Sequence, residues 1–376
     1  VLEELSEAFS SWYDLKEKDQ KANPPGYRKR NYYDDNDNLV HEEHPRSTVT
    51  WKQQGIKHDS KHNIVRLSKG FNQKQHPSDY ILIEYNARDN EEIQDIQQVR
   101  TVYNKDKQRW EVHLVCKHEV ETPKKPGEET AGIDLGISNF LAISYSTEKS
   151  EIYPSNRLKQ DEYYFLKEIA KCDDSDSNKA RKLHHKRTER RNQFIHSLAK
   201  KVVERCVEEN VGLIRIGDLS WIRTDMDDEV KNWGKHGNLD LHSWPFDKFT
   251  AILEYKAKRR GIEVDEVSER GTSKTCCICG IKDKNQRVER GLYVCSEHGD
   301  AFHSDVGGAE NIRRNIAEES NSESDDSSSS SYGKNKPKNL SLDEDRCTGW
   351  LAQPGVYLYD LSCGFLPQTE VVDCKP

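Results

Sequence analysis

Two short pairs of metal-ligand residues constrain the fold of this chain more than any other feature. Cys276 and Cys279 form a CxxC pair, and Cys295 and His298 form a CxxH pair after 15 intervening residues. Pairs at this separation are typical of a zinc ribbon, in which two β-knuckles place four ligands around one tetrahedral ion. Four protein ligands leave no open position, so such a zinc is structural. The alternatives are free thiols, or a register in which Cys277 replaces Cys276.

The other cysteines do not suggest a disulfide framework. Of the ten, Cys116, Cys172 and Cys206 are isolated, whereas the remainder include the cluster around the ribbon, and clustering favours metal binding. No apolar run approaches the roughly 20 residues that cross a bilayer, and the start lacks a signal-peptide pattern, so we expect a cytoplasmic protein without a membrane segment. The chain begins at Val1 as if already inside a helix, and we expect its natural N-terminus to lie upstream.

The first third of the chain predicts a separate domain. An apolar stripe at helical spacing opens it, and residues 47–120 then show the alternation of antiparallel strands. We expect an N-terminal helix and a β-barrel-like nucleic-acid-recognition domain over residues 1–122. A segment rich in proline and glycine follows, which predicts a linker over residues 123–130.

The rest of the chain has a different pattern, in which strands alternate with long helices. This pattern predicts a mixed α/β sheet over residues 131–271, the ribbon over 272–300 and a last helix over 301–316. Residues 317–346 are acidic and serine-rich, with too few apolar side chains to fold, and we expect a disordered tail. Residues 347–376 regain aromatic side chains, but their pattern indicates no role.

Two aspartates stand out by their surroundings. Asp134 lies between Ile133 and Leu135 in a predicted strand, where burying a carboxylate is costly unless it is paired or binds a metal. A carboxylate that only satisfies the following turn is an equal alternative. Asp305 precedes a predicted helix, so it is either an N-cap or an acid that the nearby ribbon holds in place.

A local run of basic residues contrasts with the net charge of −8. Between residues 179 and 201 nearly every charge is positive, which favours a nucleic-acid footprint over a merely solvated helix face. Two more basic residues lie beside the first ligand pair of the ribbon. The candidate nucleic-acid-binding residues are therefore Lys182, Lys186, Arg187, Arg190, Arg191, Arg270 and Lys274.

Several motifs resemble one family when they are taken in order. They are "GIDLGISNFLAIS", "GDLSWIR", "TSKTCCICG", "YVCSEHG" and "HSDVGGAENI", and they are similar to landmarks of the transposon-encoded TnpB proteins, also called OrfB transposases. The acidic composition and "RGLYVC" most resemble the haloarchaeal branch. The resemblance implies an RNase H-like (RuvC) nuclease domain with an inserted zinc ribbon. It also implies that three carboxylates hold two Mg²⁺ ions, with Asp134 as the first acid and Asp305 as the third.

The second acid is where this sequence departs from the family pattern. The family has glutamate at the position of Gly217. Asp218 could replace this second acid, although neighbouring strand residues face opposite sides of a sheet. Glu254, at the edge of the buried face of a later helix, is another candidate. The remaining alternative is an incomplete, inactive site.

The resemblance implies an RNA-guided, Mg²⁺-dependent DNA endonuclease. A transposon-end RNA would guide the protein, and pairing of that RNA with target DNA would supply sequence specificity. The alternative is a catalytically impaired protein that binds DNA, guided or unguided. An RNA-independent resolvase fits less well, because such an enzyme does not call for an inserted ribbon.

Overall fold

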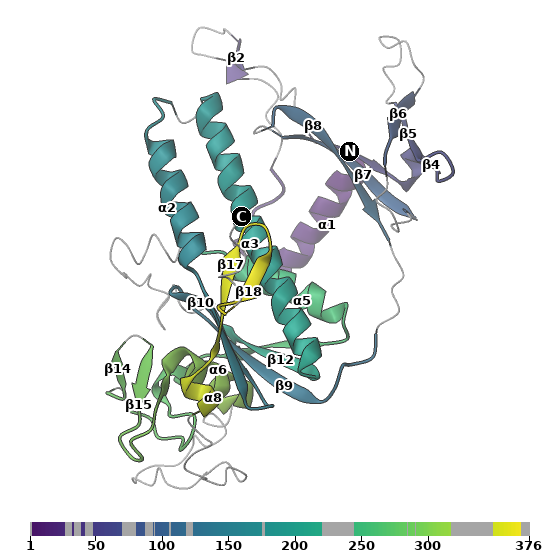
Figure 1. Ribbon diagram of the computed structural model, residues 1–376. Coiled ribbons are helices and arrows are strands. Elements are labelled where there is room, and N and C mark those ends of the chain that lie inside the picture. Colours follow the sequence, from purple (N-terminus) through teal and green to yellow (C-terminus); the bar gives the residue numbers. More distant parts are fainter. Residues whose placement is uncertain are drawn as a thin grey trace. The chain divides into compact units, whose positions relative to one another are not determined.

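The computed structural model divides the chain into two compact units, residues 1–120 and 121–376 (Figure 1). Each unit is described by itself. The residues that the structure describes are 2–26, 32–33, 39–41, 48–69, 80–86, 93, 95–104, 107–117, 123–174, 177–219, 244–283, 285–289, 291–316 and 349–369. The expected tail at 317–346 therefore lies outside the described residues.

The first unit contains one helix and short antiparallel strands. Val65, Leu67, Ile96 and Val99 form its small buried core. One sheet has the order β3-β7-β8 and another the order β4-β5-β6, and β1 pairs with β2. The elements are α1 (Leu2–Lys18), β1 (Tyr32–Tyr33), β2 (Leu39–His41), β3 (Val49–Lys52), β4 (Ile56–Asp59), β5 (Ile64–Ser68), β6 (Tyr80–Glu84), β7 (Ile96–Asn104) and β8 (Arg109–Cys116).

A mixed sheet is the centre of the second unit. Its order is β13-β12-β9-β10-β11-β17-β18, with β12 parallel to both β9 and β13, and β10 antiparallel to β9 and β11. This is the expected RNase H-like arrangement, and it confirms the predicted fold class. The strands are β9 (Glu129–Leu135), β10 (Asn139–Tyr145), β11 (Lys149–Pro154), β12 (Val211–Asp218), β13 (Glu263–Ser268), β17 (Gly355–Asp360) and β18 (Gly364–Pro367).

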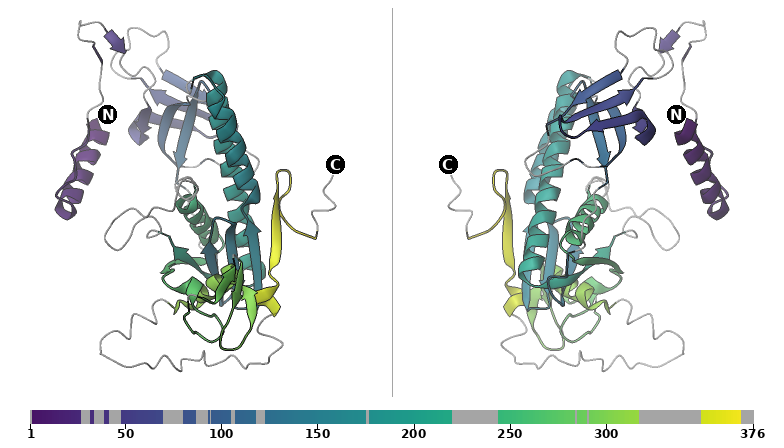
Figure 2. Two further views of the ribbon diagram at one scale, coloured as in Figure 1. Left: turned by 90° about the vertical axis from the view of Figure 1, so that its left-hand side faces the viewer. Right: turned by 90° about the vertical axis from the view of Figure 1, so that its right-hand side faces the viewer.

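Helices cover both faces of this sheet (Figure 2). α2 (Asn156–Ala170) packs along α3 (Asn178–Glu208), and α3 packs with α5 (Phe246–Lys258) over the larger core, which includes Ile143, Phe194 and Phe249. α6 (Ser304–Arg314) and the ribbon pack on the opposite face, where Ala142 and Val306 are buried. Strand alternation explains why Ala142 and Ile143 enter different layers. Among the described helices, none is both long and apolar enough to cross a membrane.

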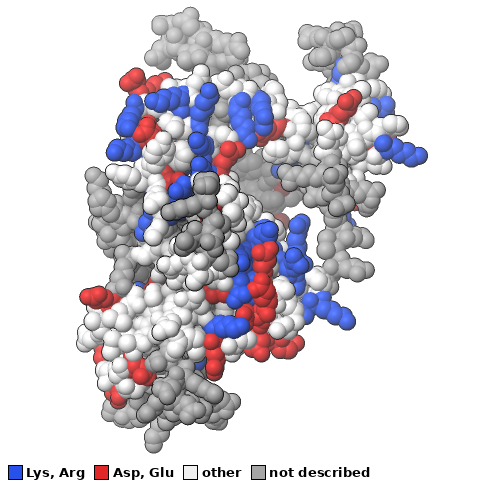
Figure 3. Space-filling model, in the orientation of Figure 1, with Lys and Arg blue, Asp and Glu red and all other residues white. Residues whose placement is uncertain are grey.

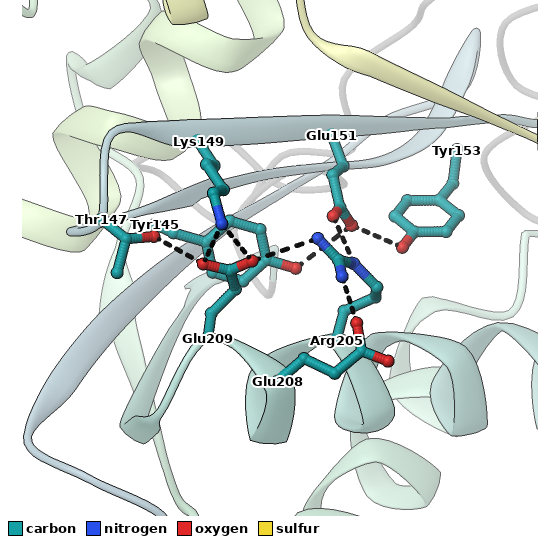
Figure 4. Close-up of polar contacts among 8 residues, drawn as sticks. All are labelled: Tyr145, Thr147, Lys149, Glu151, Tyr153, Arg205, Glu208 and Glu209. Carbon is teal, nitrogen blue, oxygen red and sulfur yellow. Dashed lines mark hydrogen bonds and ion pairs between the residues drawn. The ribbon is translucent and has the colours of Figure 1, made fainter.

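A buried polar network fixes the end of α3 to the β10–β11 hairpin (Figure 4). Arg205 Nε donates to Glu151 Oε1 at 2.6 Å, and Tyr153 Oη donates to Glu151 Oε2 at 2.7 Å. Lys149 Nζ donates to Glu209 Oε1 at 2.9 Å. Glu151 and Glu209 are both buried, and their carboxylates are compensated by these cations and donors.

The C-terminal segment, for which the sequence pattern indicates no role, completes the sheet. β17 pairs in parallel with β11, and β18 folds back on β17. Tyr357 stacks on Tyr153 with ring centroids 5.2 Å apart, and Phe365 is buried in the larger core. The short helix α8 (Gly349–Ala352) precedes this hairpin and buries Leu351 on the α6 side. β11 is therefore covered by chain that lies far away in the sequence.

Candidate active site and metal centre

The ribbon consists of two matching knuckles and a small antiparallel sheet. The sheet contains β14 (Arg287–Glu289), β15 (Leu292–Val294) and β16 (Ala301–His303). In one knuckle the Gly280 N–H donates to the Cys276 carbonyl at 2.9 Å, and in the other the Gly299 N–H donates to the Cys295 carbonyl at 2.9 Å. Both glycines have positive φ, 77° and 73°, which permits the tight turn after each ligand pair.

The structure brings the four predicted metal ligands together. One ligand atom from each of Cys276, Cys279, Cys295 and His298 lies within 4.8 Å of the others. Cys276 Sγ is 3.3 Å from His298 Nε2, and Cys279 Sγ is 3.6 Å from Cys295 Sγ. Asp300 Oδ2 lies 2.8 Å from the other ring nitrogen, Nδ1. This carboxylate favours the tautomer that leaves Nε2 available to a metal. Three thiols and one imidazole in this arrangement fit a structural zinc.

The ribbon is attached firmly to α6. Cys277 is buried outside the ligand cluster, and its carbonyl accepts from Arg314 Nη1 at 2.7 Å. Asn311 Nδ2 donates to the carbonyls of Thr272 and Thr275, each at 2.7 Å. These bonds join the entrance of the ribbon to the helix that carries Asp305. The ribbon therefore positions α6 as well as its own ligands.

Asp134 and Asp305 face one another from β9 and the first turn of α6. Burial raises the pKa of Asp134 to about 8, the charge of Asp305 adds to that increase, and Arg287 opposes it. A Cβ at Gly308 would lie 2.7 Å from Asp134 Oδ2, so a larger residue there would have to displace this carboxylate. The two acids therefore lie close enough for their charges to interact, and their roles as metal ligands, which the family resemblance implies, stay a prediction.

The Asp305 carboxylate is directed into the site and does not cap its helix. The residue before α6 is His303, whose Nδ1 accepts from the Asp305 N–H at 3.3 Å. Asp305 Oδ2 accepts from Asn139 Nδ2 at 2.9 Å, and Oδ1 accepts from Arg287 Nη2 at 3.1 Å. Because His303 provides the cap, the alternative of Asp305 as an N-cap is wrong.

Glu269 lies beside this acid pair, and the sequence reasoning missed it. Burial raises the pKa of Glu269 to about 9, and the charges of Asp134 and Asp218 add to the increase. Its Oε1 atom is buried and has no hydrogen-bond partner among the described residues. A signal for it exists in the sequence, because the carboxyl ends of neighbouring parallel strands meet at one edge of a sheet, and Glu269 directly follows β13.

The two second-acid candidates from the sequence line a pocket on the α5 side, although Asp218 also lies close enough to Glu269 for its charge to raise the pKa of Glu269. Asp218 and Glu254 line a pocket of about 300 Å³ between β12 and α5, together with Asp247 and Glu266. Asp134 and Asp305 do not line this pocket. Burial raises the pKa of Glu266, and the three neighbouring acids reinforce the effect. The structure thus groups Asp218 with Glu254 on the α5 side, while Asp134 and Asp305 meet on the α6 side.

Three of the candidate nucleic-acid-binding arginines have protein partners. Arg187 Nε donates to Glu162 Oε2 at 2.7 Å, and Arg191 Nε donates to Glu162 Oε1 at 2.8 Å. Arg190 Nη1 lies 4.0 Å from Asp161 Oδ2. These arginines connect α3 to α2, so their first contribution is to the pairing of the two helices.

The four candidate lysine and arginine residues outside that contact are exposed. Lys182 and Lys186 lie on the outer surface of α3, and Arg270 and Lys274 lie before the ribbon. Lys and Arg side chains gather over the upper end of the α2–α3 hairpin (Figure 3). This surface is basic, and the binding of nucleic acid there stays a prediction.

Two family models match parts of this chain. The fold and site define an RNase H-like α/β protein in which helix α6 follows an inserted ribbon. Residues 113–223 match the family model OrfB_IS605, described as "Probable transposase", and residues 246–312 match "Cas12f1-like, TNB domain". These matches support the TnpB family for the matched part of this chain. Its assignment to a haloarchaeal branch stays a prediction.

The similar proteins include viral and CRISPR-associated members. The chain is 29% identical to a TnpB-like protein of Acidianus two-tailed virus over 51% of this chain and 43% of the relative. It is 23% identical to the CRISPR-associated endodeoxyribonuclease Cas12f1 of Sulfoacidibacillus thermotolerans, over 56% of this chain and 51% of the relative. The chain thus spans about half the length of these relatives. A solved Cas12f1–sgRNA–target DNA complex aligns with a TM-score of 0.48 and 14% identity, covering 80% of this chain and 67% of that one.

Proposed function

We propose that this chain is a transposon-associated, RNA-guided DNA endonuclease that depends on Mg²⁺. The observation that carries the proposal is the pairing of Asp134 with Asp305 on the α6 side of an RNase H-like sheet. Two carboxylates in one partly buried site repel one another, and a divalent cation relieves that repulsion. The family matches and the Cas12f1 relative, which is itself an endodeoxyribonuclease, support the same activity.

The residues around the acid pair suit a metal-dependent cleavage. Asp134 and Asp305 would hold Mg²⁺, which would supply positive charge for activating water and for stabilising charge on the phosphate. Asn139 orients the Asp305 carboxylate through a bond of 2.9 Å. Gly308 keeps α6 close enough to Asp134 for the helix to fix that carboxylate. The ribbon ligands would hold a separate, structural zinc.

Nucleic acid would bind along the exposed basic residues. Lys182 and Lys186 on α3 form one group, and Arg270 and Lys274 before the ribbon form a second, nearer to Glu269. Cationic side chains at such positions neutralise phosphates and release counterions. We propose that a guide RNA from the transposon end and its paired target DNA bind there, with base pairing supplying the sequence specificity.

A second candidate function is DNA binding without cleavage. Gly217, at the position where the family carries its second acid, favours this alternative, because a site with only two acids holds metal less well. The two functions share a fold and nucleic-acid partners, and they differ only in the completeness of the metal site.

The test is cleavage of a guide-matched plasmid by the protein purified with its co-expressed transposon-end RNA. We expect Mg²⁺-dependent cleavage that is lost in Asp134→Ala and in Asp305→Ala, while both variants still bind the target. Binding of target DNA without cleavage by the unmutated complex would favour the second function. Absence of both guided binding and cleavage would contradict the first.

A further inference from the structure

Gly217 leaves a gap in the row of residues beside Asp134. β12 and β9 are parallel, and Ile216 pairs with Ile133, so Gly217 and Asp134 are the next residues along the two strands. Paired residues in adjacent strands direct their side chains to the same face. A side chain at position 217 would therefore point to the α6 face, where Asp134 meets Asp305.

The Glu269 carboxylate fills this gap. A Cβ at Gly217 would lie 2.0 Å from Glu269 Oε1 and 2.3 Å from its Cγ, far inside van der Waals contact. A glutamate at position 217 and the present Glu269 conformation therefore exclude one another. The two side chains would occupy the same volume, and this chain uses the one that belongs to residue 269.

The strand order explains how a residue outside β12 reaches this position. β13 is the parallel neighbour of β12, and Val267 pairs with Gly217. Glu269 lies two residues after Val267, so alternation returns it to the same face. The Thr272 N–H and Oγ1 both donate to the Glu269 carbonyl, at 3.1 and 2.9 Å. Asn311 on α6 in turn holds the Thr272 carbonyl, so the backbone that carries Glu269 is fixed to the helix that carries Asp305.

The surroundings of Glu269 lack a positive partner among the residues that the structure describes. Its Oε1 atom is buried there without a hydrogen-bond partner. Burial of a carboxylate without a partner is costly, whereas ligation to a divalent cation would supply the missing charge.

We propose that Glu269 is the second metal-binding acid of this site, supplied from the end of β13 in place of the absent side chain at position 217. This inference rests on the proposed nuclease function and completes its metal site with Asp134 and Asp305. It assigns the second metal-binding role to Glu269 and not to Asp218 or Glu254, which line the pocket beside α5 together with Gly217.

An exchange of the two positions tests the proposal. The variants are Glu269→Gln, Glu269→Ala, Gly217→Glu and the double variant Glu269→Ala with Gly217→Glu. Asp218→Asn and Glu254→Gln are matched controls that remove a nearby carboxylate from the pocket. Each full-length protein with its RNA is measured for Mn²⁺ affinity by calorimetry, for cleavage of guide-matched DNA, and for zinc content and melting temperature as tests of folding.

We expect Glu269→Gln to lower Mn²⁺ affinity and cleavage by about 100-fold or more, above the 10–100-fold typical of losing an outer-shell partner. The double variant should recover both, because Glu269→Ala vacates the volume that the side chain introduced by Gly217→Glu then fills. The two control variants should keep parental Mn²⁺ affinity. If Glu269→Gln binds Mn²⁺ like the parent, or if Asp218→Asn or Glu254→Gln loses that affinity instead, the assignment is overturned.

The metal measurement also distinguishes this inference from the proposed function. In one outcome the parent cleaves no guide-matched DNA, but Mn²⁺ affinity falls in Glu269→Gln and returns in the double variant. That result would support the assignment of Glu269 as a metal ligand and contradict the proposed guided cleavage. If the parent and Glu269→Gln cleave guide-matched DNA equally well, the proposed nuclease function is supported and the proposed role of Glu269 is contradicted. Gly217→Glu alone should lower the melting temperature, since both glutamates then compete for one volume.

Discussion

The guanidinium of Arg287 lies 3.1 Å from the carboxylate of Asp305, so the ribbon contributes a cation directly to the acid pair. Arg287 belongs to β14, and its charge also lowers the pKa of Asp134. The ribbon thus acts on the site in two ways. It holds α6 in place through Asn311 and Arg314, and it balances part of the negative charge there.

Removing that charge should change the metal dependence of the site. Arg287→Ala leaves Asp305 without a competing cation, so we expect the Mg²⁺ concentration for half-maximal cleavage to fall several-fold. Arg287→Lys keeps the charge and should stay near the parental value. A Mg²⁺ titration of the initial cleavage rate provides the measurement. An unchanged or higher Mg²⁺ requirement in Arg287→Ala would show that Arg287 does not compete with the metal.

Substitutions in the acid pair and in the zinc ligands should have different effects on zinc content and cleavage. Asp305→Ala should abolish cleavage while keeping one equivalent of zinc, because Asp305 is not among the ribbon ligands. Cys295→Ser should lose zinc, lower the melting temperature and weaken cleavage and nucleic-acid binding, because the unfolded ribbon releases α6. Metal analysis and thermal unfolding of both variants provide the measurement. Loss of zinc from Asp305→Ala would contradict this division.

Local spacing predicted the ribbon, and the family resemblance supplied two of the three acids of the proposed metal site. The CxxC and CxxH pairs determine their ligands within a few residues of chain, and Asp134 and Asp305 lie in short motifs of recognisable type. Glu269 could not be found in this way. Its place depends on the parallel register of β12 and β13, and on the volume left by a glycine 52 positions earlier in the sequence.

The sequence also could not show which basic residues of α3 are exposed, because that depends on how α3 packs against α2. The run on α3 reads as one positive face, but Arg187 and Arg191 both pair with Glu162, which belongs to α2. No periodicity within α3 reveals which of its charges a second helix will neutralise. The C-terminal hairpin is a similar case, because its pairing with β11 joins segments that are separated by most of the second unit.

The lysines and the paired arginines should therefore behave differently on substitution. Lys182→Ala and Lys186→Ala should each weaken nucleic-acid binding and reduce the slope of log K against log salt by about 1, without lowering the melting temperature. Glu162→Gln should instead lower the melting temperature, since it removes the shared partner of Arg187 and Arg191. Salt-dependent binding titrations and thermal unfolding distinguish the two. A lysine variant with an unchanged salt slope would place that side chain outside the phosphate contacts.

The network at the end of α3 makes stability depend on pH. Burial acts to raise the pKa of Glu209, but hydrogen bonds from Lys149 and Thr147 and the charges of Lys149 and Arg205 outweigh it, so the pKa is lowered (Figure 4). A group whose pKa is lower in the folded protein stabilises the fold above its unfolded pKa. That contribution is lost as the pH falls through the folded pKa.

Glu209→Gln tests this contribution. At pH 7 we expect the variant to be less stable by about 1–3 kcal/mol, because the buried donors of Lys149 and Arg205 lose their charged acceptor. The difference from the parent should shrink as the pH falls below the range in which a free glutamate titrates, about 4.3. Urea unfolding of both proteins at pH 7, 4 and about 3 provides the measurement, because the contribution is lost between the unfolded pKa and the lower folded pKa. Glu208→Gln, at a more exposed position, is the control. A difference that stays constant over this range would mean that Glu209 stabilises the fold by packing and not by its charge.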